Sequence, residues 1–190
     1  MIPGVALRSK RAQRAPAGRR RFVVRPIGFV RSPYRDRDEV PRGLGARHTI
    51  EGVLEVLPEF AAGLGDIEGF SHLFVLWVFD RSERASLVSH PPSDDRPHGV
   101  FATRSPNRPN RIGLTVVKLL RREGDRLLVR GVDMLDGSPI LDLKPVLSSV
   151  PENELRRGWL AEAEARSHAA SRAARRRGPR ATPSVRRLRR

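Results

Sequence analysis

The chain has 190 residues, which is enough for one domain with a hydrophobic core. It contains no cysteine, and this excludes disulfides and thiolate metal sites. The longest apolar run, residues 73–79, is too short to cross a bilayer, and no apolar stretch of a signal peptide follows the basic N-terminus. We therefore expect a soluble cytoplasmic protein with no membrane span.

The positive charge is concentrated at the two ends of the chain. The net charge is +16, yet residues 1–21 hold seven basic residues and residues 166–190 hold ten arginines, with no acidic residue in either segment. Residues 22–165 therefore sum to −1. We predict a basic disordered tail over 1–21 and a helical to disordered arginine-rich tail over 161–190. Two interpretations of these tails stay open, namely phosphate contacts with RNA and compositional drift.

Residues 22–160 are predicted to form one all-β domain. Apolar and polar residues alternate from residue 48 to 57, which is typical of a half-buried strand. Gly124-Asp125 indicates a hairpin, and Pro58 is placed to open a short helix. Short strands with turns between them favour a small closed β-barrel, and residues 152–177 favour a short C-terminal helical extension. The predicted strands cover residues 22–30, 48–57, 71–79, 112–120, 126–132 and 140–143.

Residues 99–114, GVFATRSPNRPNRIGL, carry the densest polar pattern. Arg104, Asn107 and Arg108 lie on a path stiffened by Pro106 and Pro109. A rigid loop with many donors is typical of a preorganised binding site. The alternative is an exposed polar turn between two strands.

Two carboxylates follow in residues 131–139, GVDMLDGSP. Asp133 and Asp136 suit ribose hydroxyls or an ammonium group, although Asp136-Gly137 is equally typical of a plain turn. These carboxylates are too few for a metal site, so we predict no metal. Among the other residues, His72 and Trp77 are expected in the core, and Trp159 is expected either to cover the barrel or to stack on a base.

Together, these segments resemble the TsaA-like, or TrmO, family. The resemblance implies a small β-barrel that binds S-adenosylmethionine, commonly at a homodimer interface. It also implies methylation of N6 of N6-threonylcarbamoyladenosine beside the anticodon of tRNA. The motifs that carry the resemblance are IGFVRSPY at 27–34, VPR at 40–42, IEGFSHLFVLWVF at 67–79, the segment 99–114, and GVDMLDGSPILDLKP at 131–145.

Carried over motif by motif, the resemblance implies a set of site residues. Arg104, Asn107 and Arg108 are implied to bind the substrate, and Asp133 or Asp136 is the candidate proton acceptor. The residues implied to bind S-adenosylmethionine are Pro41, Arg42, Gly43, Asp80, Arg81, Arg104, Leu114, Asp133, Met134, Leu135 and Asp136.

The chain departs from the family pattern at four positions. Asp80 stands where the family often has histidine, Gly43 replaces glutamine, Arg111 replaces proline and Val146 replaces tyrosine. These departures keep two alternatives open. One is a non-catalytic protein on the same barrel that binds S-adenosylmethionine or RNA, and the other is a methyltransferase with a different small substrate.

Overall fold

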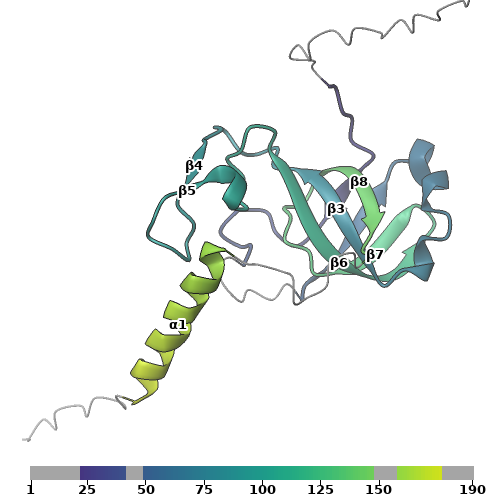
Figure 1. Ribbon diagram of the computed structural model, residues 1–190. Coiled ribbons are helices and arrows are strands. Elements are labelled where there is room, and N and C mark those ends of the chain that lie inside the picture. The colour runs from purple at the N-terminus through teal and green to yellow at the C-terminus, as the bar shows by residue number, and fades with distance from the viewer. Residues whose placement is uncertain (1–21, 42–48, 148–157, 177–190) are drawn as a thin grey trace, which may run out of the picture.

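Six strands form one antiparallel sheet in the computed structural model, which describes residues 22–41, 49–147 and 158–176 (Figure 1). The hydrogen-bonded neighbours run in the order β1-β2-β7-β6-β3-β8, and β8 also pairs with β1 through two residue pairs. The prediction of an all-β domain is confirmed in this form. The strands are β1 (Gly28–Arg31), β2 (Glu51–Val56), β3 (His72–Val78), β6 (Ile112–Glu123), β7 (Arg126–Arg130) and β8 (Pro139–Pro145).

Short elements and one helix complete the described chain. The helix α1 (Trp159–Arg176) projects away from the sheet, as Figure 1 shows, and it lies within the predicted helical extension. Pro58 opens a 3-10 helix, as its position predicts. The predicted N-terminal tail, residues 1–21, lies outside the described residues, as do residues 177–190 of the C-terminal tail, whereas residues 161–176 belong to α1. The short elements are η1 (Pro58–Leu64), η2 (Ile67–Gly69), β4 (Val88–Ser89), β5 (His98–Gly99) and η3 (Val100–Ala102).

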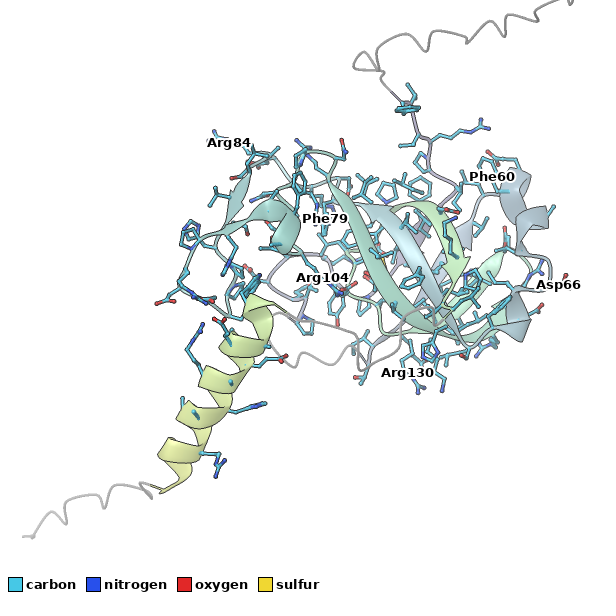
Figure 2. The ribbon with its side chains drawn as sticks, in the orientation of Figure 1. Phe60, Asp66, Phe79, Arg84, Arg104 and Arg130 are labelled. Carbon is cyan, nitrogen blue, oxygen red and sulfur yellow. The ribbon has the colours of Figure 1, made fainter. Side chains whose placement is uncertain are left out.

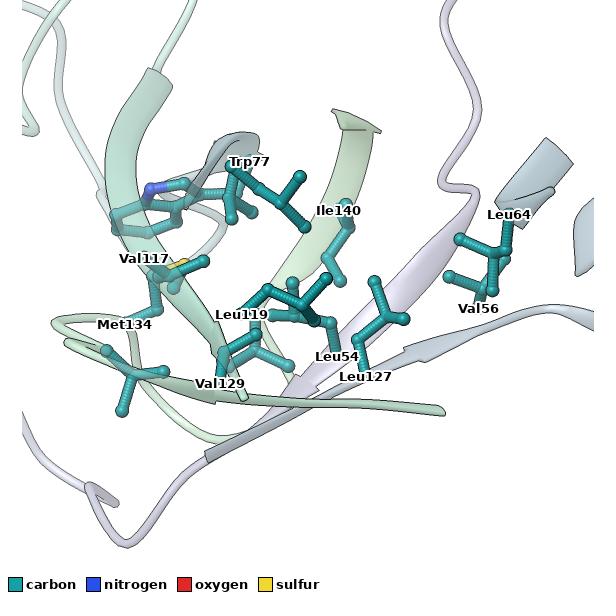
Figure 3. Packing of buried hydrophobic residues seen from close by; sticks show 14 of the residues in the cluster. Leu54, Val56, Leu64, Trp77, Val117, Leu119, Leu127, Val129, Met134 and Ile140 are labelled. Atoms are coloured by element: carbon teal, nitrogen blue, oxygen red, sulfur yellow. The ribbon is translucent and has the colours of Figure 1, made fainter. Parts of the chain in front are cut away.

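The core is built by alternate residues of the strands. On β2, Gly52, Leu54 and Val56 face inward as the alternation predicts. Gly124 adopts a φ of 66° in the predicted turn between β6 and β7, a conformation that glycine tolerates at low cost. Each fully buried aliphatic side chain contributes about 1.5–3 kcal/mol of transfer free energy. The core cluster includes Leu73 and Val75 and, labelled in Figure 3, Leu54, Val117, Leu127, Val129 and Ile140.

Two expectations for the strands are wrong. The first strand begins at Gly28 rather than at Phe22, and Phe22 and Val23 are exposed. His72 is not a core residue, because it occupies the first outward position of β3 and its ring contacts the Ser71 hydroxyl. A continuous apolar run does not identify the inward face, since only the pairing of the strands decides which alternate positions are buried.

Candidate active site

Asp136 joins two segments of the candidate site, the loop 131–138 and residues 32–36 after β1. Its Oδ1 accepts a hydrogen bond from the Ser32 amide at 3.1 Å, and its Oδ2 pairs with the Arg35 guanidinium. The Asp136 amide donates to the Tyr34 carbonyl at 2.8 Å. Both carboxylate oxygens of Asp136 are therefore engaged within the protein, and this residue holds the two segments together.

Asp133 is held differently, by a short chain of side chains. The indole Nε1 of Trp77 donates to Thr115 Oγ1 at 3.0 Å, and Thr115 Oγ1 donates to Asp133 Oδ1 at 2.6 Å. Trp77 and Thr115 are buried, whereas Asp133 is half-buried. Within the described part of the chain, Asp133 Oδ2 accepts no hydrogen bond. Asp133 thus presents an oriented oxygen that a ligand can use.

The Tyr34 hydroxyl is the second polar group of this cluster with spare bonding capacity. It is buried and has no hydrogen-bond partner among the described residues. Burial first, and the nearby charge of Asp133 second, raise the pKa of Tyr34. The phenol therefore stays protonated at neutral pH and remains a hydrogen-bond donor. A buried donor left without a partner costs about 1–3 kcal/mol, which a polar ligand atom would recover.

Arg81, which follows β3, links residues 32–36 to the loop 131–138. Its Nη1 donates to the Arg35 carbonyl at 2.8 Å, and its Nη2 donates to the Asp136 carbonyl at 2.7 Å. Beside this junction lies an open depression of about 630 Å³, lined by residues 35–39 with Arg81, Glu83 and Leu135. Acidic and basic side chains alternate along its wall, and part of their bonding capacity is used within the protein, because Glu39 accepts from two backbone amides and Arg37 donates to the Arg81 carbonyl.

The segment 99–114 holds its own shape through side-chain bonds. Asn107 Oδ1 accepts from the Ser82 hydroxyl at 2.8 Å, and Arg108 Nη1 donates to the Thr103 carbonyl at 3.4 Å. Arg104 is exposed and forms no hydrogen bond to another described residue; in the view of Figure 2 it lies between the sheet and the first turn of α1. Arg104 is therefore the arginine of this segment that is available to a ligand.

Comparison with known proteins identifies the family. The family model described as the tRNA-methyltransferase O N-terminal domain matches residues 29–151. The chain belongs to the TrmO family. A probable S-adenosyl-L-methionine-binding protein of Pyrococcus abyssi is 47% identical over 143 residues, which cover 73% of this chain and 76% of that protein. A mouse tRNA (adenine(37)-N6)-methyltransferase is 35% identical over 70% of this chain and 33% of its own length.

The solved structures agree with this assignment. A crystal structure of TrmO from P. aeruginosa has a TM-score of 0.62 and 34% identity, and the match covers 74% of this chain. The chain spans just under two-thirds of that protein's length, 63%. The recognised resemblance to the TrmO family is thus confirmed.

The departure from the TrmO pattern at Arg111 has a backbone consequence. Arg111 adopts a φ of 51°, whereas proline is restricted to about −65°. Its amide donates to the Arg108 carbonyl at 3.1 Å, and its Nη2 donates to the Glu83 carbonyl at 3.1 Å. The turn at Arg111 is therefore incompatible with the proline of the family pattern.

The structure gathers part of the predicted TrmO cofactor set. The run Asp133 to Asp136 and Arg81 lie together, although the Met134 side chain is fully buried and belongs to the core. Leu114 lies on the outward face of β6, 54% exposed, opposite to the inward Thr115. The exposed residues Pro41 and Asp80 form no hydrogen bond with another described residue, and predicted Arg42 and Gly43 lie outside the described residues.

Sequence reasoning missed Thr115 and gave little weight to Tyr34. A polar residue at an inward position of an alternating strand was the available signal for Thr115, since such a residue must find a buried partner. Among the described residues, no group of three or more histidine or acidic side chains could hold a metal ion. In the same part of the chain, no helix is long and apolar enough to span a membrane.

Proposed function

We propose that this chain transfers the methyl group of S-adenosylmethionine to N6 of N6-threonylcarbamoyladenosine, beside the anticodon of a tRNA, in the cytoplasm. The family match over residues 29–151 carries the proposal. The name of the mouse relative supports methylation at an adenine N6 of tRNA, and the names of several archaeal relatives support S-adenosylmethionine as the cofactor.

The polar groups of the site fit this cofactor. When bound, S-adenosylmethionine supplies an electrophilic methyl group on a positively charged sulfur. Asp133 Oδ2 has the free acceptor capacity that a ribose hydroxyl or an ammonium group requires, and the Tyr34 hydroxyl offers a neutral donor beside it. The mixed charges around the depression suit the amino-acid part of the molecule, which carries an ammonium and a carboxylate.

Two further tasks fall to residues of this chain. Methylation of N6 requires the loss of its proton, and of the two candidates Asp133 is the better acceptor because both oxygens of Asp136 are already engaged. The one free oxygen of Asp133 can either hold the cofactor or take this proton. A raised Kd for S-adenosylmethionine in Asp133→Asn assigns the first role, and a lowered kcat with an unchanged Kd assigns the second. Arg104 has a free guanidinium, which suits the substrate carboxylate or a tRNA phosphate through forked hydrogen bonds. Asn107 and Arg108 hold the loop in shape through their hydrogen bonds to Ser82 and Thr103, and we propose that they also contact the substrate there.

A homodimer and a closed barrel belong to the same proposal. The pairing of β8 with β1 supports closure of the sheet into a small barrel. On its outer surface, Ile112, Leu114 and Val116 of β6 are exposed, and across the β3–β6 pairing they lie opposite Val78, Leu76 and Phe74. A second copy would cover this apolar face and would bring Leu114 to the partner's cofactor site. Val116→Glu should yield a monomer in multi-angle light scattering.

Methyl transfer to tRNA that carries N6-threonylcarbamoyladenosine tests the activity directly. The wild-type protein should form the N6-methylated nucleoside, detected by mass spectrometry, and Asp133→Asn should lower kcat at least 100-fold. Asp142→Asn is the matched control, because Asp142 is half-buried on β8, as Asp133 is in its loop, and pairs with Lys144. No methylated nucleoside from the wild-type protein, with saturating cofactor and tRNA, would exclude this activity.

A non-catalytic S-adenosylmethionine-binding protein is the second candidate. The first four relatives carry the name of binding proteins only, and Asp80 departs from the family pattern. Calorimetric titration separates the two functions, since this alternative predicts cofactor binding without transfer. Loss of the methylated nucleoside in a deletion strain would exclude it.

A further inference from the structure

The helix α1 lies outside the segment that the TrmO family model matches. That match ends at residue 151, and α1 begins at Trp159. The helix nevertheless docks on the family domain, on residues 94–102, where β5 and η3 lead into the segment that carries Arg104. The contacts at this junction involve a buried charge and an aromatic stack, and they define what the helix does.

Asp94 is the centre of the junction. Its side chain is 0% exposed, and it binds arginines from both sides. Arg96 donates through Nε to Oδ1 at 3.2 Å and through Nη2 to Oδ2 at 2.9 Å, while Arg166 of α1 donates to Oδ2 at 3.0 Å. Arg96 also reaches Glu162 of α1 at 3.4 Å. A buried carboxylate that accepts hydrogen bonds from two arginines fixes the geometry of both, because a charge removed from water is stable only when its oxygens are paired.

Trp159 extends the junction into the segment that carries Arg104. Its ring stacks on His98, with centroids 4.2 Å apart and planes at 18°. Its indole Nε1 donates to the Ala102 carbonyl at 2.9 Å. Ala102 ends η3, and Val100 at the start of η3 is buried. The turn is thus anchored at both ends, two residues before Arg104.

We propose that α1 is a positioning element that holds the turn 100–104 so that Arg104 is presented to the tRNA. This inference rests on the proposed tRNA methyltransferase function. Trp159 and Asp94 act through the turn and are positioning residues. None of their hydrogen bonds reaches Asp133, Tyr34 or the depression beside Arg81. The resemblance places Arg104 in both the cofactor set and the substrate set. We assign it to the substrate here, because no hydrogen bond between described residues joins Arg104 to Asp133, Tyr34 or the lining of the depression. The helix is therefore expected to act on the binding of tRNA and to leave the binding of S-adenosylmethionine unchanged.

Graded variants of Trp159 test the proposal. Trp159→Phe keeps a ring for His98 and removes the donor to Ala102, so KM for tRNA should rise about 3- to 10-fold, the range for one hydrogen bond. Trp159→Ala removes stack and donor, and KM should rise further, while kcat and the Kd for S-adenosylmethionine stay within 2-fold of wild type. His168→Ala is the control, because His168 is exposed on α1 and forms no hydrogen bond with another described residue.

The rate of amide hydrogen exchange in residues 100–104 measures directly how firmly this turn is held. Exchange should accelerate in Trp159→Ala and not in His168→Ala. An unchanged KM for tRNA in Trp159→Ala, despite faster exchange, overturns the proposal. A parallel loss of cofactor binding, tRNA binding and melting temperature also overturns it, because it assigns Trp159 a role in overall stability only. Wild-type kinetics in the same assay report on the proposed function separately, and a wild-type protein that binds no tRNA removes both.

Discussion

Gly113→Ala tests how tightly Trp77 is packed above the site. Gly113 and Trp77 are direct partners in the β3–β6 pairing, and the indole lies against the glycine. A Cβ on Gly113 would lie 2.3 Å from Cε2 and 2.6 Å from Nε1 of Trp77. Carbon atoms in contact sit about 3.5–4.0 Å apart, so the indole has to move by about 1 Å or more.

The expected cost follows from three contributions. Forcing a buried ring to move costs about 1–3 kcal/mol. Loss of the 3.0 Å bond from Trp77 to Thr115 leaves a buried donor unpaired, at about 1–3 kcal/mol. The lower backbone entropy of alanine in the unfolded state returns about 0.4–1 kcal/mol. The free energy of unfolding should therefore fall by about 1–5.5 kcal/mol, whereas an unhindered glycine position would gain stability.

Urea unfolding followed by far-UV circular dichroism measures this loss. A second variant, Trp77→Leu, removes the ring that collides with the new methyl group. The cost of Gly113→Ala should then shrink by about 1 kcal/mol or more in the Trp77→Leu background, since residues in contact couple. A cost below about 0.5 kcal/mol for Gly113→Ala alone, or additive costs in the double variant, would refute the packing argument.

Three further predictions concern the site, its backbone and its pH dependence. Thr115→Val removes the donor to Asp133 and should weaken the binding of S-adenosylmethionine, measured by calorimetry, about 10-fold. Thr115→Ser keeps a hydroxyl and should bind S-adenosylmethionine with nearly the wild-type affinity. Equal affinities of the two variants would contradict the role of the hydroxyl. The φ of 51° at Arg111 suits glycine and excludes proline. Arg111→Gly should therefore raise the free energy of unfolding by about 1 kcal/mol, and Arg111→Pro should lower it by about 3 kcal/mol. The opposite order of stability in urea titrations would contradict the assigned backbone. The hydrogen bonds from Arg96 hold the pKa of Asp94 well below its usual value of about 3.9. The stabilisation from these bonds is therefore present above about pH 4 and is lost as the pH falls toward the lowered pKa. Tryptophan fluorescence should report undocking of α1 only in that acidic range, and a pH profile unchanged by Asp94→Asn would exclude this cause. The charged and titratable groups around Asp94 are Asp95, Arg96, His98, Glu162 and Arg166.

Local patterns in the sequence predicted most of the strands. The alternation on β2 and the turn at Gly124 depend on side-chain period and backbone preference, which neighbouring residues largely determine. The family motif at 99–114 likewise predicted a special loop, because its residue types are unusual for a plain turn. The start of β1 and the exposure of His72 escaped prediction, since strand pairing sets both.

The division of labour between the two aspartates was decided only by the tertiary structure. Asp133 and Asp136 are equivalent in sequence, yet Thr115 orients one carboxylate while Ser32 and Arg35 occupy the other. The docking of α1 through Asp94 is similar, because its partner Arg166 lies 72 residues away in the chain. Sequence determined the chemical groups and their local backbone, and long-range packing determined which groups remain free to bind. A local pattern can indicate that a buried polar side chain needs a partner, as for Thr115, but it does not identify a partner far away in the chain.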